Sequence, residues 1–144
     1  MDLHLLQTLP SVPCAAGAVL ITEGRPAEGL YFLESGEVEV LKGGELIAEV
    51  YEPGAVFGDM AYLLGSAPTA TVRALTTCVF RHVADPREYF RKNPDSALHM
   101  AVILARRLQA GDSGGEMRRA LAHLPLPGVA ERVIESYYVP GGKA

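Results

Sequence analysis

Short apolar runs separated by turn residues dominate the chain before Asp85. The run 30–33 reads Leu-Tyr-Phe-Leu, and the run 37–41 alternates acidic and apolar side chains as a half-buried strand does. The Gly43-Gly44 pair that follows predicts a tight hairpin. Short strands punctuated by glycine and proline predict an antiparallel, jelly-roll-like β-barrel, so the expected fold class is mainly β. Further strands are expected at 18–21, 46–51, 56–57, 71–76 and 78–83.

Helical patterns flank the predicted barrel. Leucines at helical spacing over 3–9 predict a short N-terminal helix that ends at Pro10. Asp85-Pro86 is typical of a helix start and predicts a short helix over 86–92. Asn93-Pro94 repeats that signal and opens a longer helix. Its apolar face is expected to carry Leu98, Val102, Ala105 and Leu108.

The glycine-rich segment 111–115 is expected to end the long helix and to act as a linker. We therefore expect one barrel domain with its helices over 1–112, followed by a linker and a short helical extension over 113–144. The proline-interrupted extension shows no basic recognition helix, so no DNA-binding domain is expected in this chain.

Composition narrows the class of protein. The 144 residues suit a single domain, and a net charge of −4 argues against a nucleic-acid interface. No apolar run approaches the roughly 20 residues of a membrane span, and Asp2 stands where a signal peptide needs positive charge. Cys14 and Cys78 are too few for a disulfide framework and are expected to be free thiols. These features predict a cytoplasmic protein that does not bind membranes.

The residues that usually carry catalysis do not form a recognisable set. There is no nucleophile-elbow motif, no phosphate-binding loop of the Walker type and no paired-carboxylate constellation. The four histidines are scattered without the spacing of a metal site. We therefore predict a non-enzymatic protein with no metal and no cofactor.

One stretch does carry the pattern of a ligand site. Residues 57–74 read Phe-Gly-Asp-Met-Ala-Tyr-Leu-Leu-Gly-Ser-Ala-Pro-Thr-Ala-Thr-Val-Arg-Ala, which predicts a strand ending at Gly58, a short helix over 59–64, a loop and a new strand. The first backbone N–H groups of a helix have no intrahelical acceptor, so residues 58–61 are candidates to hold an anion.

Three segments together resemble the cyclic-nucleotide-binding domain family, in the form of the effector domain of bacterial cAMP receptor protein-type regulators. They are 21–38, the stretch 57–74, and the run Ala-Arg-Arg-Leu-Gln over 105–109. The resemblance extends over residues 1 to about 112. It implies a regulatory or sensor domain, here without a DNA-binding domain, that binds cAMP, cGMP or a related small anionic ligand.

The family pattern implies a role for the first half of the stretch. In the family, N–H groups at the start of the short helix hold the cyclic phosphate, and a carboxylate two residues after the phenylalanine accepts the ribose hydroxyl. Asp59 takes that position here, one methylene shorter than the usual Glu. The implied ligand-binding residues of this half are Phe57, Gly58, Asp59, Met60 and Ala61.

The second half departs from the family pattern. The family reads Pro-Arg-Ala-Ala-Thr-Val, whereas residues 67–72 read Ala-Pro-Thr-Ala-Thr-Val. Alignment on Thr-Val places Pro68 at the arginine position, and alignment on the proline places Thr69 there. The implied second half, Pro68, Thr69 and Ala70, thus lacks the guanidinium that pairs with the phosphate.

Two interpretations follow from this departure. An arginine from elsewhere, namely Arg25, Arg73 or Arg81, could take over the pairing, although Arg73 alternates with inward-facing residues and is expected to face solvent. Alternatively, the domain has lost nucleotide binding and acts as a protein-interaction or dimerisation module through its C-terminal helices.

Overall fold

The computed structural model describes residues 6–109, and these fall into two compact units that divide after Pro86. The first part of the predicted N-terminal helix, residues 3–5, lies outside the described residues. The same holds for the linker at 111–115, the predicted boundary at 112 and the extension over 113–144.

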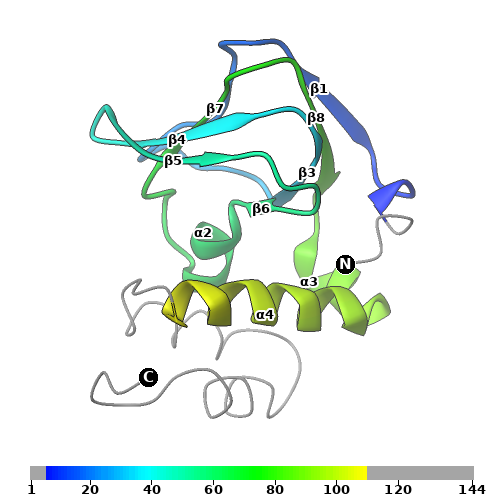
Figure 1. Cartoon of the computed structure of the whole chain (residues 1–144). Helices are drawn as coiled ribbons and strands as arrows, with labels where there is room; N and C mark the ends of the chain where they lie inside the picture. The colour runs from blue at the N-terminus through cyan, green and yellow to red at the C-terminus, as the bar shows by residue number, and fades with distance from the viewer. Residues whose placement is uncertain (1–5, 110–144) are drawn as a thin grey trace. The chain divides into compact units, whose positions relative to one another are not determined.

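The first unit consists of two four-stranded sheets in which every pair of neighbouring strands is antiparallel (Figure 1). One sheet has the order β1 (Ser11–Cys14), β8 (Cys78–Val83), β3 (Leu30–Ser35) and β6 (Val56–Phe57). The other has the order β2 (Val19–Ile21), β7 (Thr71–Ala74), β4 (Val38–Lys42) and β5 (Glu45–Val50). The predicted mainly-β, antiparallel, jelly-roll-like fold is confirmed.

Strand β1 is not among the strands predicted above. It contains Pro13 and follows Pro10, which obscure a strand pattern because proline cannot donate to a ladder. β1 lies at the edge of its sheet and pairs with β8, so the backbone N–H groups on its other side are not needed for a β-ladder. Its partner is more than sixty residues away in sequence, and local patterns carry no information about that pairing.

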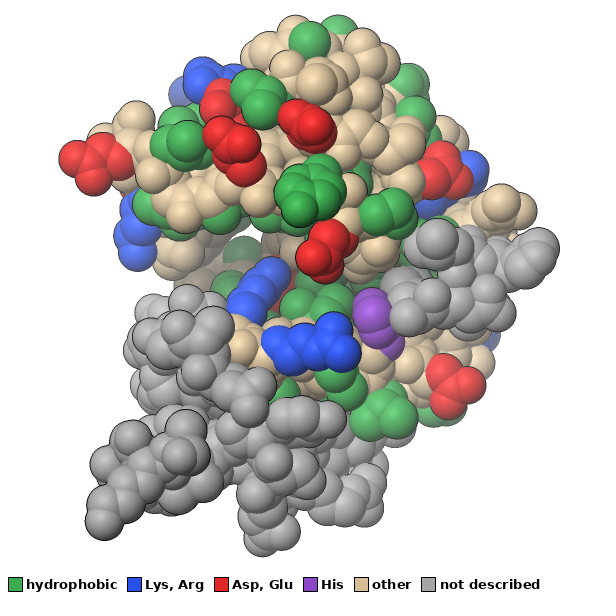
Figure 2. Space-filling model, in the orientation of Figure 1, with side chains coloured by type: hydrophobic (Ala, Val, Ile, Leu, Met, Phe, Trp, Pro, Cys, Tyr) green, Lys and Arg blue, Asp and Glu red, His purple; other side chains and the backbone are tan. Residues whose placement is uncertain are grey.

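The predicted hairpin is confirmed. β4 and β5 pair with Lys42 opposite Glu45, so Gly43 and Gly44 form the turn between them. β5 is an edge strand of its sheet and pairs with β4. It is exposed along nearly its whole length, with Leu46 and Ile47 more than half exposed. Figure 2 shows hydrophobic and acidic side chains interspersed on the visible face of this unit.

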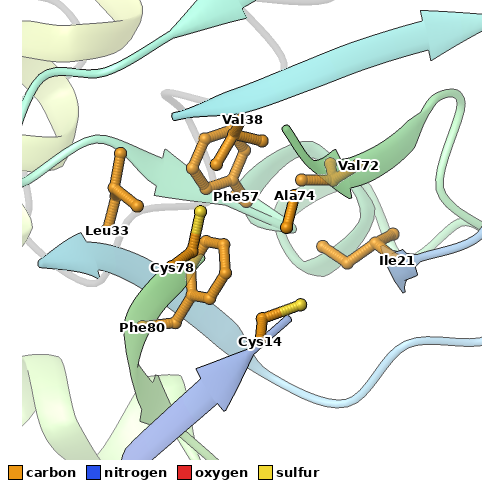
Figure 3. Packing of buried hydrophobic residues seen from close by; sticks show 9 residues of the cluster. All are labelled: Cys14, Ile21, Leu33, Val38, Phe57, Val72, Ala74, Cys78 and Phe80. Carbon is orange, nitrogen blue, oxygen red and sulfur yellow. The ribbon is translucent and has the colours of Figure 1, made fainter. Parts of the chain in front are cut away.

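The core lies between the two sheets. Side chains from both sheets point toward one another in Figure 3, and they include Phe57 and Phe80 from one sheet and Val38 and Val72 from the other. The rings of Phe57 and Phe80 meet edge to face, with centroids 6.1 Å apart. Burial of this apolar surface is the main favourable contribution to the fold.

Both cysteines belong to this core and are free, as expected. Burial raises the pKa of the Cys14 and Cys78 thiols above the usual 9.0, and for Cys78 the neighbouring Cys14 adds to the effect. The two thiols are therefore protonated at neutral pH and make poor nucleophiles.

Helix α2 (Asp59–Leu64) connects the two sheets, between β6 and β7, and has the bounds that the sequence predicts. It ends at Gly65, which has φ 64° and donates its N–H to the Ala61 carbonyl. That C-cap satisfies a carbonyl at the helix end and stops the helix after less than two turns.

The described part of the second unit contains α3 (Pro86–Lys92), which begins at the division, and α4 (Pro94–Gln109). Asn93 joins them: its side-chain amide donates to the Tyr89 carbonyl at 2.9 Å, and its own carbonyl accepts from the Ser96 N–H at 3.0 Å. Both helices start at the predicted Pro signals.

The predicted apolar face of α4 is only partly right: Ala105 is buried and Val102 is half-buried, but Leu98 is 47% exposed. The buried apolar positions of the helix are Ala97, Met100, Ala101, Leu104 and Ala105. Apolar residues occupy more than one stripe of this helix, so helical spacing alone does not identify the packed one. The buried stripe is rich in alanine, whose small side chain permits close approach of a neighbouring element.

Candidate functional site

The first half of the candidate site starts at the end of strand β6. Phe57 is 7% exposed and lies opposite Tyr31 in the register of β6 and β3. Gly58 follows with φ 86° and ψ 0°, a left-handed conformation that favours glycine. A Cβ on Gly58 would lie 3.0 Å from the Gly29 carbonyl oxygen and 3.6 Å from Ile21 Cδ1. The chain therefore reverses here in close contact with neighbouring strands.

Helix α2 begins directly after this reversal. At the start of the helix, the Tyr62 N–H donates to the Gly58 carbonyl at 3.1 Å. The N–H groups of Asp59, Met60 and Ala61 precede this bond and belong to the first turn. Asp59 is only 4% exposed, and no side chain caps the helix at Gly58. An acidic residue in the first turn is favourable because the helix dipole is positive there.

The second half is the loop before strand β7. Pro68 is buried, Ala70 is half-buried, and Thr69 is exposed. The Pro68 carbonyl accepts a hydrogen bond from the Gly24 N–H at 2.8 Å. One residue into β7, the Thr71 hydroxyl oxygen accepts from the Glu23 N–H at 3.0 Å.

The loop over 22–29, between β2 and β3, contacts both halves. Its Gly24 and Glu23 bind the Pro68–Thr71 side, and its Gly29 lies against Gly58. The eight predicted residues therefore do not form the site alone, because this loop joins their two groups. Sequence patterns missed the role of the loop, because Gly24 and Glu23 lie 44 and 48 positions before the residues that they bond, Pro68 and Thr71.

The loop is itself fixed at its far end. The His82 ring nitrogen Nε2 lies 2.9 Å from the Glu28 carbonyl oxygen, and the His82 ring stacks on Tyr31 with centroids 4.4 Å apart. Burial, with a smaller contribution from the Glu28 carboxylate, raises the pKa of Tyr31 above 10.0. Tyr31 thus stays neutral and supports the loop by stacking.

Two of the three arginines considered above have partners. Arg73 forms an ion pair with Glu39, which faces it across β7 and β4. Arg81 pairs with Glu34 at 2.9 Å and donates to the Leu9 carbonyl at 2.9 Å. Arg73 keeps 42% of its side chain exposed, in agreement with the expectation that it faces solvent. Both guanidinium groups are engaged within the sheets.

The described residues were compared with the requirements of a metal site and of a membrane-spanning helix. Within residues 6–109, no three His, Cys, Asp or Glu side chains are grouped so as to hold a metal ion. In the same range, no helix has the length and apolar character needed to span a bilayer.

Known proteins are similar to this chain over the strand region and beyond. Glutaminase 2 of Bradyrhizobium diazoefficiens is 39% identical over 105 residues, which are 68% of this chain and 16% of that protein. The cAMP-activated global transcriptional regulator CRP of Pasteurella multocida is 33% identical over 99 residues, which are 64% of this chain and 47% of the regulator. The chain thus spans less than half the length of these relatives.

The fold is also that of a solved regulator. The crystal structure of the Thermus thermophilus catabolite activator protein matches with a TM-score of 0.64 at 26% identity, over 74% of this chain and 53% of that one. The model of the cyclic nucleotide-binding domain matches residues 11–92, which include both halves of the candidate site and the loop that joins them. The chain belongs to the cyclic nucleotide-binding domain family.

Proposed function

We propose that this chain is a non-enzymatic regulatory domain of the cytoplasm that binds cAMP, cGMP or a related small anion at residues 57–61 and 68–70. The observation that carries the proposal is the family match over 11–92, within which α2 starts at Asp59 directly after a left-handed glycine. Residues 1–112 are the proposed binding domain.

The first half offers the chemistry that such a ligand needs. Backbone N–H groups in the first turn of α2 point toward the helix N-terminus, where a cyclic phosphate is favoured. The Asp59 carboxylate has acceptor sites on both oxygens and is suited to a ribose hydroxyl. Because Asp59 is almost fully buried, a hydrogen bond to it is stronger than one made in bulk water.

The second half lowers the expected affinity. Loss of one partner from a buried charge-assisted pair costs about 2–5 kcal/mol, and about 1.4 kcal/mol is a tenfold change in affinity. A domain without the family arginine at Pro68 or Thr69 is therefore expected to bind cyclic nucleotides weakly. Starting from a micromolar ligand, this loss gives a dissociation constant between roughly tens of micromolar and millimolar.

Titration calorimetry with cAMP and cGMP tests the proposal. We expect binding to the wild-type protein, and binding about tenfold weaker for Asp59→Asn, which keeps the shape but loses the charge that strengthens the hydroxyl contact. The unfolding midpoint of the variant identifies any effect that comes from the fold instead. If the wild-type protein gives no binding heat and no NMR chemical-shift change at millimolar ligand, the proposal is refuted.

A gain of affinity provides a second test. Thr69 is exposed, so Thr69→Arg places a guanidinium at one of the two aligned family positions without burying it. We expect cAMP binding to strengthen by about 30-fold, which corresponds to about 2 kcal/mol. Thr69→Gln, which extends the side chain without charge, serves as the matched control and should not reproduce this gain.

A second candidate function is a protein-interaction or dimerisation module. This function is favoured because Arg73 and Arg81, two of the three arginines that could replace the missing family arginine, are already paired with carboxylates. Sedimentation of the full chain over a range of concentrations distinguishes the two functions. A monomer at all concentrations that binds cyclic nucleotide excludes a dimerisation module, whereas a dimer without nucleotide binding supports it.

A further inference from the structure

Arg25 lies in the loop that joins the two halves of the candidate site. The Arg25 N–H donates to the Thr22 carbonyl at 3.1 Å, which closes a turn with Gly24 at φ 79°. The next N–H back along the chain, that of Gly24, is the one bonded to the Pro68 carbonyl. Arg25 is therefore one residue away from a direct main-chain contact with Pro68, one of the two positions that align with the family arginine.

The Arg25 side chain differs from the other two arginines. It is exposed, and within residues 6–109 it has neither a hydrogen bond nor an ion pair, whereas Arg73 and Arg81 are held by carboxylates. Of the two acidic residues in the same loop, Glu23 accepts a hydrogen bond from the Gly43 N–H at 2.9 Å. Glu28 acts electrostatically on Tyr31. The guanidinium of Arg25 is thus available to an anion.

We propose that Arg25 supplies the positive charge that pairs with the phosphate of the bound ligand, so that the charge comes from the loop 22–29 instead of residues 68–69. The inference rests on the proposed function and deepens it, since it assigns a binding residue outside the family pattern. The ligand class is a nucleotide with a singly charged cyclic phosphate, whose oxygens suit the planar fork of an arginine.

Calorimetric titration of cAMP into the full chain tests the assignment. We expect Arg25→Ala to bind cAMP about tenfold more weakly than the wild type, and Arg25→Lys to lie between them because an ammonium keeps the charge but not the fork. Lys42→Ala is the matched control. Lys42 is an exposed cation at the hairpin whose Gly43 contacts the same loop, and its removal should leave the affinity unchanged.

An uncharged ligand separates phosphate pairing from a general effect on the site. Adenosine lacks the phosphate, so its affinity should be the same for the wild type and Arg25→Ala. The double variant Arg25→Ala with Thr69→Arg should recover cAMP binding, because the charge returns from the other side of the Gly24–Pro68 contact.

The outcomes distinguish this inference from the proposed function. Wild-type protein that binds cAMP while Arg25→Ala binds equally well overturns the inference and leaves the proposed function standing. An equal loss of affinity for adenosine, or for cAMP in Lys42→Ala, also overturns it. Absence of binding of both cAMP and cGMP by the wild type contradicts the proposed function itself, and the assignment of Arg25 with it.

Discussion

Residues 57–64 are held in place by burial, whereas residues 67–70 are held by the main chain of a neighbouring loop. In the first segment Phe57, Asp59 and Leu63 are buried, and Gly58 packs closely against Gly29. In the second segment Pro68 is buried but Thr69 is exposed, and a backbone hydrogen bond joins Pro68 to Gly24. Side-chain identity therefore matters for the structure of the first segment and is much freer in the second.

The largest expected difference is in core packing. Phe57→Ala should lower the free energy of unfolding by about 3–5 kcal/mol, because it removes a buried ring that packs edge to face on Phe80. Thr69→Ala should change it by no more than about 0.5 kcal/mol, since Thr69 is exposed. Urea denaturation of both variants measures the difference, and comparable losses would show that the two segments contribute equally to stability.

A smaller effect is expected at the glycines that bound α2. Gly58→Ala should cost about 2–3 kcal/mol, because it combines left-handed strain with a Cβ placed 3.0 Å from the Gly29 carbonyl oxygen. Gly65→Ala has similar strain, at φ 64°, but no atom within 4 Å of the added Cβ, so about 1 kcal/mol is expected. Thermal or urea unfolding ranks the two, and the reverse order would mean that the close approach at Gly58 is unimportant.

The hydrogen bond between the loop and Thr71, the residue that follows the second segment, should contribute still less to stability. Thr71→Val removes the acceptor of the Glu23 N–H and should cost about 0.5–1 kcal/mol, because this exposed N–H can bind water instead. Thr71→Ser keeps the oxygen and should retain most of the stability. If Ser and Val are equally destabilising, the lost contribution belongs to the threonine methyl group.

The smallest effect near neutral pH comes from the two thiols in the core behind Phe57. Their folded-state pKa values are raised by burial, so the unfolded chain ionises first, and stability is full below pH 9.0 and falls as pH rises through the folded-state pKa. Cys14→Ala and Cys78→Ala should each reduce this alkaline loss. Part of the alkaline loss of stability should remain in both variants, because the pKa of Tyr31 is also raised in the folded state. Denaturant unfolding between pH 7 and 11 measures the slope.

The sequence predicts elements that local signals define. α2 and α3 have the predicted bounds because glycine, aspartate and proline mark their starts, and β8 has them because a continuous β-prone run defines it. β1 escaped prediction because its evidence is its partner β8, far along the chain. The packed face of α4 was only partly predicted because Leu98 extends an apolar surface that the fold leaves exposed.

The candidate site divides in the same way. The residues of each half could be named from the family pattern, and the strand–helix–loop–strand order over 57–74 is confirmed. Their roles in ligand binding stay predictions. The loop that joins them could not be predicted, because the bonds from Gly24 and Glu23 connect positions 44 and 48 residues apart. Nor could the ion pairs of Arg73 and Arg81, which depend on tertiary pairing.

The hydrogen bond between Gly24 and Pro68 has a consequence for how such domains diverge. It joins main-chain atoms, so side-chain changes at the exposed positions of either segment leave the frame of the site unchanged. A functional charge can then be lost from one segment and gained on the other without an intermediate that misfolds. Under our assignment of Arg25, the arginine of this domain has migrated in that way, and column-by-column alignment would score it as a loss.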